Sequence, residues 1–236
     1  MTIKGVFFDL DDTLHDHLAP FSDAIKATFN NELNSVNIEI LYKSFRHFSD
    51  ILWKTYTADQ ITLEELRIQR IIKALESFHF SISRDKATLF QKEYENMSNE
   101  LKLFTEVPET ITSLEQKGLL IGIITNGPFQ HQINKIKMLG LDKIVPRHNI
   151  FISDAVGIAK PNPKIFSYVC EKTCFLPNEL IYVGDTWAND VVAPIEAGWH
   201  SIWFNHRNRT PETNHKPDAV VEDIESLNIA INLLLS

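Results

Sequence analysis

Short, nearly continuous apolar runs recur along the chain and alternate with stretches that have the period of an amphipathic helix. The first run holds Ile3, Val6, Phe7 and Phe8 and ends at Asp9. Such unbroken apolar character is typical of a central strand of a parallel sheet, which is covered on both faces. The runs of this kind predict strands at 3–8, 119–124, 150–152, 180–183 and 201–204, with a short edge strand at 219–221 before a final helix.

Amphipathic helices are predicted between these strands, at 107–116, 130–139, 163–174 and 190–197. Gly118, Gly140 and Gly198 each fall just past one of them, where a helix C-terminus favours a residue that tolerates positive φ. Strands that alternate with helices are typical of a doubly wound, Rossmann-like parallel sheet. We therefore expect an α/β core.

Residues 16–99 have a different pattern, with no convincing strand and no glycine. They contain amphipathic pieces at 38–53 and 63–78, and Thr62 followed by Glu65 predicts a capping box at the start of the second piece. We interpret this segment as an all-helical subdomain inserted after the first strand. The predicted core then consists of residues 1–15 and 100–236, with a polar loop at 206–217.

Composition narrows the class of partner. The chain has 236 residues, of which 44% are hydrophobic and 23% charged, as in an ordinary globular protein. A net charge of -8 disfavours a nucleic-acid polymer or an anionic membrane as the main partner, since both select basic surfaces. It leaves a small anionic substrate open, because a metal ion and one lysine can reverse the sign locally.

The two cysteines and the apolar stretches bear on location. Cys170 and Cys174 lie four residues apart in a predicted helix, which favours two small apolar residues on one helix face over a metal site. No secretory signal is evident, and no stretch approaches the 18 apolar residues of a membrane span. We expect a protein of the reducing cytoplasm. The sequence does not predict its oligomeric state.

Unusual polar residues follow four of the predicted strands, and in an open parallel sheet ligands bind beyond the carboxyl ends of the strands. If the predicted fold is right, these groups converge at one edge. They are Asp9, Asp11, Asp12 and Thr13 after the first strand, Thr125, Asn126 and Gly127 after the next, Lys160 beyond the third, and Gly184, Asp185, Thr186 and Asp190 at the fourth.

The chemical types of these residues form a consistent set. Several carboxylates together repel one another and invite a hard divalent cation such as Mg²⁺, which prefers oxygen ligands. Thr125 offers a hydroxyl, Asn126 a backbone N–H and Lys160 a point charge to an anion such as a phosphate. No Walker loop or dinucleotide glycine fingerprint is present. A phosphate would therefore be bound by a metal, a lysine and a hydroxyl.

Four motifs carry a resemblance to a known family. The motifs are FFDLDDTL at 7–14, ITNG at 124–127, AKPNPKIF at 159–166 and VGDTWAND at 183–190. In order and spacing they resemble the motifs of the haloacid dehalogenase-like hydrolase superfamily, and the resemblance covers essentially the whole chain. The insert is similar to that family's type 1 helical cap. Only 34 residues separate Thr125 from Lys160, which disfavours a large second-type cap.

The resemblance implies a phosphatase mechanism. Asp9 would be the nucleophile that forms an aspartyl phosphate, and Asp11 would protonate the leaving oxygen and later deprotonate the attacking water. The Asp9 side chain, the Asp11 backbone carbonyl and the Asp185 side chain would hold Mg²⁺. This arrangement implies a magnesium-dependent phosphoric monoester hydrolase that acts on a small phosphorylated metabolite.

The resemblance also assigns the residues around the phosphoryl group. Thr125, Asn126 and Lys160 would bind phosphoryl oxygens, and Asp190 would orient a metal-bound water or Lys160. His15 and His17 flank the predicted site, where a role as surface or hinge residues is favoured over catalysis.

Three residue sets have ordinary structural interpretations as well. For Thr13 a hydroxyl that braces the loop is favoured, and for Trp187 a role in packing. Aromatic residues of the insert sit at helical spacing, where they belong to the core or face the substrate. These candidates for substrate specificity are Phe45, Phe48, Trp53 and Tyr56.

Several functions compete with hydrolysis. Asp11 disfavours a haloacid dehalogenase, because those enzymes lack an aspartate two residues after the nucleophile and release a halide without a proton. A phosphomutase or phosphotransferase would use the same residues with another acceptor. A receiver-like signalling domain is disfavoured by length and by the insert, and a non-catalytic binding role by the complete set of catalytic positions. VGDTWAND resembles the 5′-nucleotidase and phosphoglycolate phosphatase-like subgroup, so the working substrate is a nucleoside 5′-monophosphate or a small sugar or acid phosphate.

Overall fold

The computed structural model describes residues 2–235, except the side chains of residues 50, 54 and 57. The chain forms two units, one made of Met1–Asp16 with Lys102–Ser236 and the other of His17–Leu101. These limits lie one or two residues from the boundaries that the sequence predicts.

The larger unit is built on a six-stranded sheet in the order β3-β2-β1-β4-β5-β6, and every neighbouring pair of strands is parallel. This confirms the predicted α/β fold. The strands are β1 (Gly5–Phe8), β2 (Leu120–Thr125), β3 (Ile150–Ile152), β4 (Leu180–Gly184), β5 (His200–Phe204) and β6 (Ala219–Val221). Because β1 lies between β2 and β4, the ends of these three strands are brought together.

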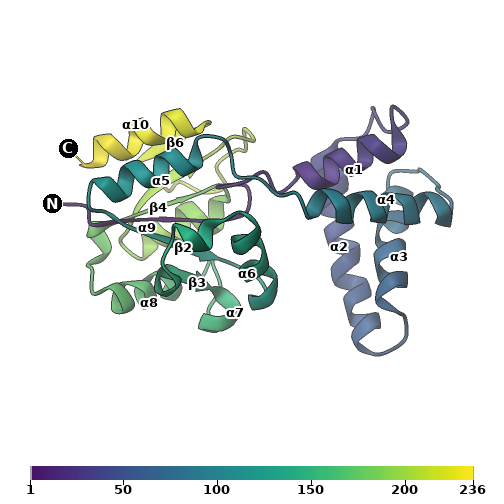
Figure 1. Cartoon of the computed structure of the whole chain (residues 1–236), viewed down its shortest axis with the longest axis horizontal. Helices are drawn as coiled ribbons and strands as arrows, with labels where there is room; N and C mark the ends of the chain where they lie inside the picture. Colours follow the sequence, from purple (N-terminus) through teal and green to yellow (C-terminus); the bar gives the residue numbers. More distant parts are fainter. Residues whose placement is uncertain (1, 236) are drawn as a thin grey trace. The chain divides into compact units, whose positions relative to one another are not determined.

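Helices cover both faces of the sheet (Figure 1). Helices α5 (Val107–Gln116) and α10 (Ile224–Leu235) lie side by side on one face, and α8 (Lys164–Thr173) and α9 (Ala193–Glu196) on the other. The remaining segments of the unit are α6 (Phe129–Met138), α7 (Ser153–Val156) and short 3₁₀ turns at Leu141–Lys143, Arg147–Asn149 and Pro177–Glu179. Burial on both sides explains why the strands are apolar at consecutive positions.

Two helix predictions need correction. The helix expected at 190–197 begins earlier, as a π-helix at Trp187–Val192, and continues as α9. Cys174 does not lie on the face of α8, since it follows the last helical residue in a left-handed conformation with φ 60° and is exposed. The glycine caps are confirmed, because Gly118, Gly140 and Gly198 have φ values of 78°, 70° and 81°.

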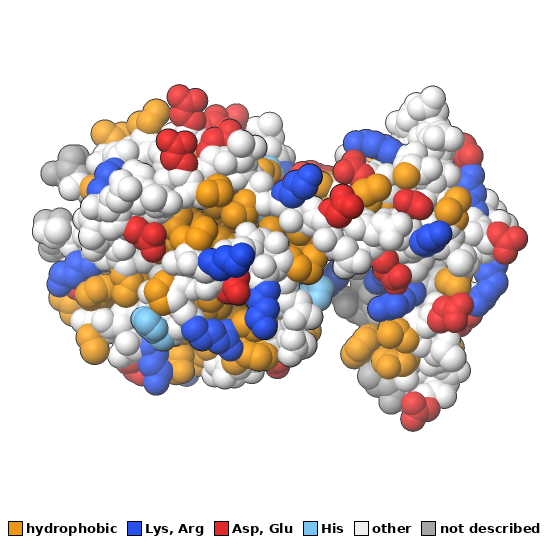
Figure 2. All heavy atoms as spheres, in the orientation of Figure 1, with side chains coloured by type: hydrophobic (Ala, Val, Ile, Leu, Met, Phe, Trp, Pro, Cys, Tyr) orange, Lys and Arg blue, Asp and Glu red, His pale blue; other side chains and the backbone are white. Residues whose placement is uncertain are grey.

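The smaller unit contains four helices: α1 (Ala19–Phe29), α2 (Ile38–Thr57), α3 (Leu63–Glu76) and α4 (Arg84–Ser98). It has its own core, in which Phe45 packs against the rings of Phe21 and Phe90. Figure 2 shows hydrophobic side chains over the ends of α2 and α3, and the exposed hydrophobic residues of this part of the chain include Trp53 and Leu63. Among the described residues, no helix has the length and apolar character needed to cross a membrane.

The start of α3 follows the prediction in part. Thr62 is the N-cap, and its side chain accepts a hydrogen bond from the backbone N–H of Glu65 at 3.1 Å. The Glu65 carboxylate accepts hydrogen bonds from Arg84 at 2.6 Å and Gln69 at 2.8 Å, which replaces the reciprocal half of the predicted capping box.

Gly122 in the middle of β2 allows a close approach within the sheet. A Cβ atom there would lie 2.1 Å from the ring of Phe7 and 2.8 Å from the backbone oxygen of Asn149. Phe7 is completely buried and packs edge-on against Trp199, with ring centroids 5.4 Å apart. The ring therefore has no space into which it can retreat.

We predict that Gly122→Ala lowers the free energy of unfolding by about 1–3 kcal/mol, because the added methyl group overpacks a dense core. Urea denaturation followed by far-UV circular dichroism measures this loss. The matched control is Ser167→Ala on the exposed side of α8, which should leave the midpoint nearly unchanged. Equal midpoints for Gly122→Ala and the wild type would contradict this account of the packing.

Candidate active site

The ammonium group of Lys160 lies at the centre of the polar residues that follow the strands. Its Nζ donates hydrogen bonds to Asp9 at 2.7 Å, to Asp190 at 2.7 Å and to the hydroxyl of Tyr182 at 2.6 Å. All four side chains are buried. Three predicted residues that lie up to 181 positions apart in the sequence, from 9 to 190, thus share one hydrogen-bonded group.

Tyr182 is a residue of this site that the sequence analysis missed. It belongs to β4, where its ring fills the core beside Phe166, and its hydroxyl donates to the carbonyl oxygen of Ile124 at 2.9 Å. Burial raises its pKa well above the ordinary value, so the hydroxyl stays protonated. The only signal in the sequence is a hydroxyl within an otherwise apolar strand.

The backbone at Lys160 is held by the side chain of Asn126. The amide nitrogen of Asn126 donates to the Lys160 carbonyl at 2.8 Å, and the amide oxygen accepts from the Lys160 N–H at 3.0 Å. The sequence predicted that Asn126 offers its backbone N–H to a phosphate. Its side chain also connects the loop that carries Lys160 to the end of β2.

Asp185 follows β4 directly, and Asp190 lies on the π-helix just beyond it. Asp190 uses both oxygens, one on Lys160 at 2.7 Å and the other on the backbone N–H of Thr186 at 2.9 Å. A Cβ atom at Gly184 would lie 2.5 Å from the carboxyl carbon of Asp190, so only glycine fits there. Asp185 accepts a hydrogen bond from Arg209, which lies on the loop after β5.

The electrostatics of the site are dominated by the burial of like charges. Burial raises the pKa of Asp9 well above its ordinary value, Lys160 opposes this rise, and Asp190 and Asp185 add to it. Burial and the charge of Asp190 raise the pKa of Asp185 to about 7. For Lys160, burial lowers the pKa, but the carboxylates of Asp190 and Asp9 more than compensate and the pKa is raised.

These carboxylates suit a divalent cation. One oxygen each from Asp9, Asp185 and Asp190 lie within 4.8 Å of one another, and all three residues are buried. The raised pKa values of Asp9 and Asp185 follow first from burial and then from the neighbouring carboxylates, and Lys160 and Arg209 do not fully offset the two effects together. Oxygen ligands of this charge are those that Mg²⁺ prefers, so the residues fit the predicted metal.

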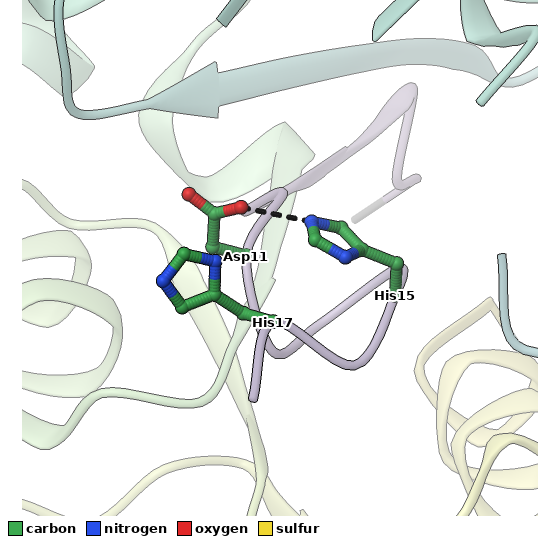
Figure 3. Close-up of side chains that lie close together, drawn as sticks. All are labelled: Asp11, His15 and His17. Carbon is green, nitrogen blue, oxygen red and sulfur yellow. Dashed lines mark hydrogen bonds and ion pairs between the residues drawn. The ribbon is translucent and has the colours of Figure 1, made fainter. Parts of the chain in front are cut away.

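Asp11 lies in a separate set of contacts at the same edge of the sheet. Lys135 Nζ is 2.7 Å from each of its carboxylate oxygens, and His15 Nε2 is 2.8 Å from one of them (Figure 3). His15 is completely buried, so it is not the surface residue that the sequence allowed, and a role as a hinge residue stays a prediction. Its backbone forms isolated bridges with residues 11 and 103.

Gln132 joins the Asp11 group to the phosphate-binding residues. Its amide nitrogen is 2.7 Å from Thr125 Oγ1, 2.8 Å from the Asn126 carbonyl and 3.3 Å from Asp11 Oδ2. Gln132 and Lys135 lie three residues apart on α6, and the sequence analysis missed both. The available signal is two long polar side chains at the buried positions of an amphipathic helix, interleaved with Ile133 and Ile136.

Comparison with known proteins identifies the family. The model of the haloacid dehalogenase-like hydrolase family matches residues 6–204, which is most of the chain. The chain belongs to this family.

Two relatives similar in sequence to this chain are named as phosphatases. Phosphoglycolate phosphatase of Haemophilus influenzae is 29% identical over 135 residues, which cover 56% of this chain and 59% of that protein. Glyceraldehyde 3-phosphate phosphatase of Methanopyrus kandleri is 28% identical over 240 residues, which cover 94% of this chain and 92% of that protein. The family and these relatives confirm the predicted phosphatase branch and the enzyme class.

Solved structures share the fold. The putative hydrolase YfnB of Bacillus subtilis, solved with magnesium, has a TM-score of 0.68 and 22% identity, with 98% of this chain and all of that chain covered. Solved dehalogenases match the same fold.

The structure also bears on the other residues that the sequence singled out in the core of this hydrolase. Trp187 is buried and packs edge-on against Trp203 with ring centroids 4.7 Å apart, as its packing interpretation requires. Thr13 is buried, but among the described residues its hydroxyl has no hydrogen-bond partner, so the expected brace is not made through that hydroxyl. Thr13 is enclosed by packing instead.

The aromatic specificity candidates divide into two groups. Phe45 is completely buried in the core of the smaller unit and is therefore not available to a substrate, which corrects its place among the candidates. Phe48 is partly buried and packs against the same core. Trp53 is 53% exposed and its ring lies 5.3 Å from that of Tyr56, so this pair remains the better candidate.

We predict that Tyr182→Phe lowers the free energy of unfolding by about 1–3 kcal/mol, because it leaves one N–H of Lys160 and the Ile124 carbonyl buried without their partner. Thermal and urea denaturation measure the loss. Tyr168→Phe on α8, where the hydroxyl is not part of the site, serves as the matched control. If both variants have the same denaturation midpoints as the wild type, the buried hydroxyl is not needed to hold Lys160.

Proposed function

We propose that the chain hydrolyses small phosphate monoesters in a magnesium-dependent reaction that passes through an aspartyl phosphate on Asp9. The observation that carries the proposal is one connected network of hydrogen bonds, which is buried at Lys160 and partly buried at Asn126 and Asp11. Lys160 connects Asp9 to Asp190, Asn126 connects Lys160 to the end of β2, and Gln132 connects β2 to Asp11. A nucleophile, a proton carrier and a cation are thereby held on one framework.

The metal fits the residues present. The Asp9 and Asp185 side chains and the Asp11 backbone carbonyl would hold Mg²⁺, which supplies positive charge between the nucleophile and the phosphoryl group when it is bound. The raised pKa values of Asp9 and Asp185 support this assignment, because a carboxylate cluster that is costly to ionise gains most from a divalent cation. YfnB, a relative with the same fold, was solved with magnesium.

Asp9 is the nucleophile of the proposed reaction. One of its oxygens is fixed by Lys160 at 2.7 Å, which leaves the other to attack phosphorus. A bond forms between this oxygen and phosphorus while the bond from phosphorus to the leaving oxygen breaks. Lys160 and the Thr125 hydroxyl are the groups for the phosphoryl oxygens, and Lys160 must exchange one of its three present partners to bind one.

Asp11 moves the protons. It donates a proton to the leaving oxygen in the first step, and in the second it accepts one from the water that attacks the aspartyl phosphate and regenerates Asp9. Lys135, His15 and Gln132 are positioning residues, since they act through Asp11. The presence of Asp11 favours phosphoryl transfer over the dehalogenase reaction, in which the leaving halide takes no proton.

The names of the relatives favour small acid and sugar phosphates as substrates. Phosphoglycolate and glyceraldehyde 3-phosphate, the substrates in those names, are both short phosphorylated molecules. A nucleoside 5′-monophosphate is the second candidate, supported by the resemblance of VGDTWAND to the nucleotidase subgroup and by the exposed ring of Trp53 beside Tyr56. If the active enzyme releases phosphate from all substrates of a panel at similar rates, the nucleotide is ruled out as its preferred substrate.

The first prediction from this mechanism concerns Asp9→Asn, which keeps the shape of the nucleophile and removes its charge. With para-nitrophenyl phosphate and a panel of nucleotides, phosphoglycolate and sugar phosphates, the wild type should release phosphate only when Mg²⁺ is present. Asp9→Asn should lose at least ~10³-fold in kcat, because no covalent intermediate can form.

The control for this assay is Asp142→Asn, which removes one carboxylate from an exposed turn of the same unit. It should keep wild-type turnover. EDTA should abolish turnover and added Mg²⁺ should restore it. No phosphate release by folded wild type with Mg²⁺, on any substrate, would contradict hydrolysis. Transfer of the phosphoryl group to added sugars would then identify a phosphotransferase.

A second prediction separates the role of Asp11 from that of Asp9. Asp11→Asn should lower kcat/KM for an alkyl phosphate by at least ~10²-fold, because the departing alkoxide needs a proton. The loss should be clearly smaller for para-nitrophenyl phosphate, since nitrophenolate leaves without one. Initial rates on the two substrates measure the difference. Equal losses on both substrates would show that Asp11 does not act as the acid toward the leaving group.

A further inference from the structure

The loop after β5 brings two arginines to the carboxylates of the site. Arg207 pairs with Asp12 and with Asp16, at 2.7 Å in each case. Arg209 pairs with Asp185 and lies 3.7 Å from Asp12. Asp185 is thus a predicted metal ligand that already has a cationic partner from the protein itself.

The backbone of Arg209 is fixed, whereas its side chain is not enclosed. Asn205 holds the turn from both sides: its amide oxygen accepts from the Arg209 N–H at 2.7 Å, and its amide nitrogen donates to the Arg209 carbonyl at 2.9 Å. The side chain of Arg209 is 34% exposed, compared with 6% for that of Asp185. The guanidinium can therefore leave Asp185 by rotation of side-chain bonds, with no movement of the loop.

We propose that Arg209 and the divalent cation are alternative partners of Asp185, so that Arg209 sets the affinity of the site for the metal. This inference rests on the metal site of the proposed function. Two cations on neighbouring oxygens of one buried carboxylate repel each other strongly at low effective dielectric constant. Asp12, within 3.7 Å of the guanidinium, offers Arg209 another carboxylate when it leaves.

The charge of the cluster agrees with an exchange rather than with joint binding. With all three carboxylates ionised, Asp9, Asp185 and Asp190 together with Lys160 have a net charge of two negatives, which matches one divalent cation. With Arg209 at Asp185, a single negative charge remains for the metal. Exchange also keeps the buried carboxylate of Asp185 paired with a cation at every stage. A buried carboxylate without a partner would be strongly destabilising.

The test is calorimetric titration of Mg²⁺ into the full-length wild type and Arg209→Gln, with no substrate present. Removal of the competitor should tighten the Mg²⁺ dissociation constant about tenfold or more. Arg209→Lys keeps the charge but shortens the reach, and should fall between the two. The matched control is Lys216→Gln, which removes one positive charge from an exposed position of the same loop, and should change the constant by no more than about twofold.

Thermal denaturation gives a second reading that does not depend on activity. In EDTA, Arg209→Gln should melt below the wild type because Asp185 has lost its partner, and Mg²⁺ should raise its melting temperature more than that of the wild type. If the wild type binds Mg²⁺ and Arg209→Gln binds it no more tightly, the proposed exchange is wrong, but the metal site is supported. Absence of Mg²⁺ binding in both proteins would overturn the metal site and the exchange together.

Discussion

The site depends on one buried cation among buried carboxylates. Lys160 has its ammonium group between Asp9 and Asp190, 2.7 Å from an oxygen of each, and its positive charge offsets part of the cost of burying these two carboxylates. Removal of one partner from such a group is strongly destabilising, because it leaves an uncompensated charge in a medium of low dielectric constant. The geometry of the nucleophile and the stability of the core are therefore linked through the same nitrogen atom.

This constraint explains residue choices that look unrelated in the sequence. Gly184 lacks a side chain because the Asp190 carboxyl group occupies that space, and Tyr182 supplies the third acceptor that an ammonium group requires. Asn126 fixes the backbone of Lys160 from the neighbouring strand. Gly184 and Tyr182 belong to β4 and Asn126 follows β2, so residues from two strands hold the one lysine.

The sequence predicted those parts of the site that follow from the architecture of a parallel sheet. Asp9, Thr125 and Asp185 end neighbouring strands, and apolar runs are enough to locate strand ends. Lys135 and Arg209 could not be found in this way, because one lies on a helix face and the other on a polar loop. The role of each depends on the distant carboxylate that it contacts in the folded chain, and a local sequence pattern does not predict that contact.

Burial was harder to predict than position. His15 stands in a polar stretch that predicts a loop, yet its side chain is completely buried, and its backbone forms isolated bridges with residues 11 and 103. Phe45 was similar to its aromatic neighbours in spacing, and only the packing of four helices separates it from the exposed Trp53. Helical periodicity gives the face of a helix, but the depth of a residue depends on which helix covers that face.

An acidic protein that binds a phosphate must reverse its own field locally. The chain has a net charge of -8, and its strand ends add further carboxylates, yet Lys160, Lys135, Arg207 and Arg209 all point at these carboxylates. The cations do not form an open basic patch, because each is already paired. Lys160 can therefore contact a phosphoryl oxygen only by giving up one of its three present partners.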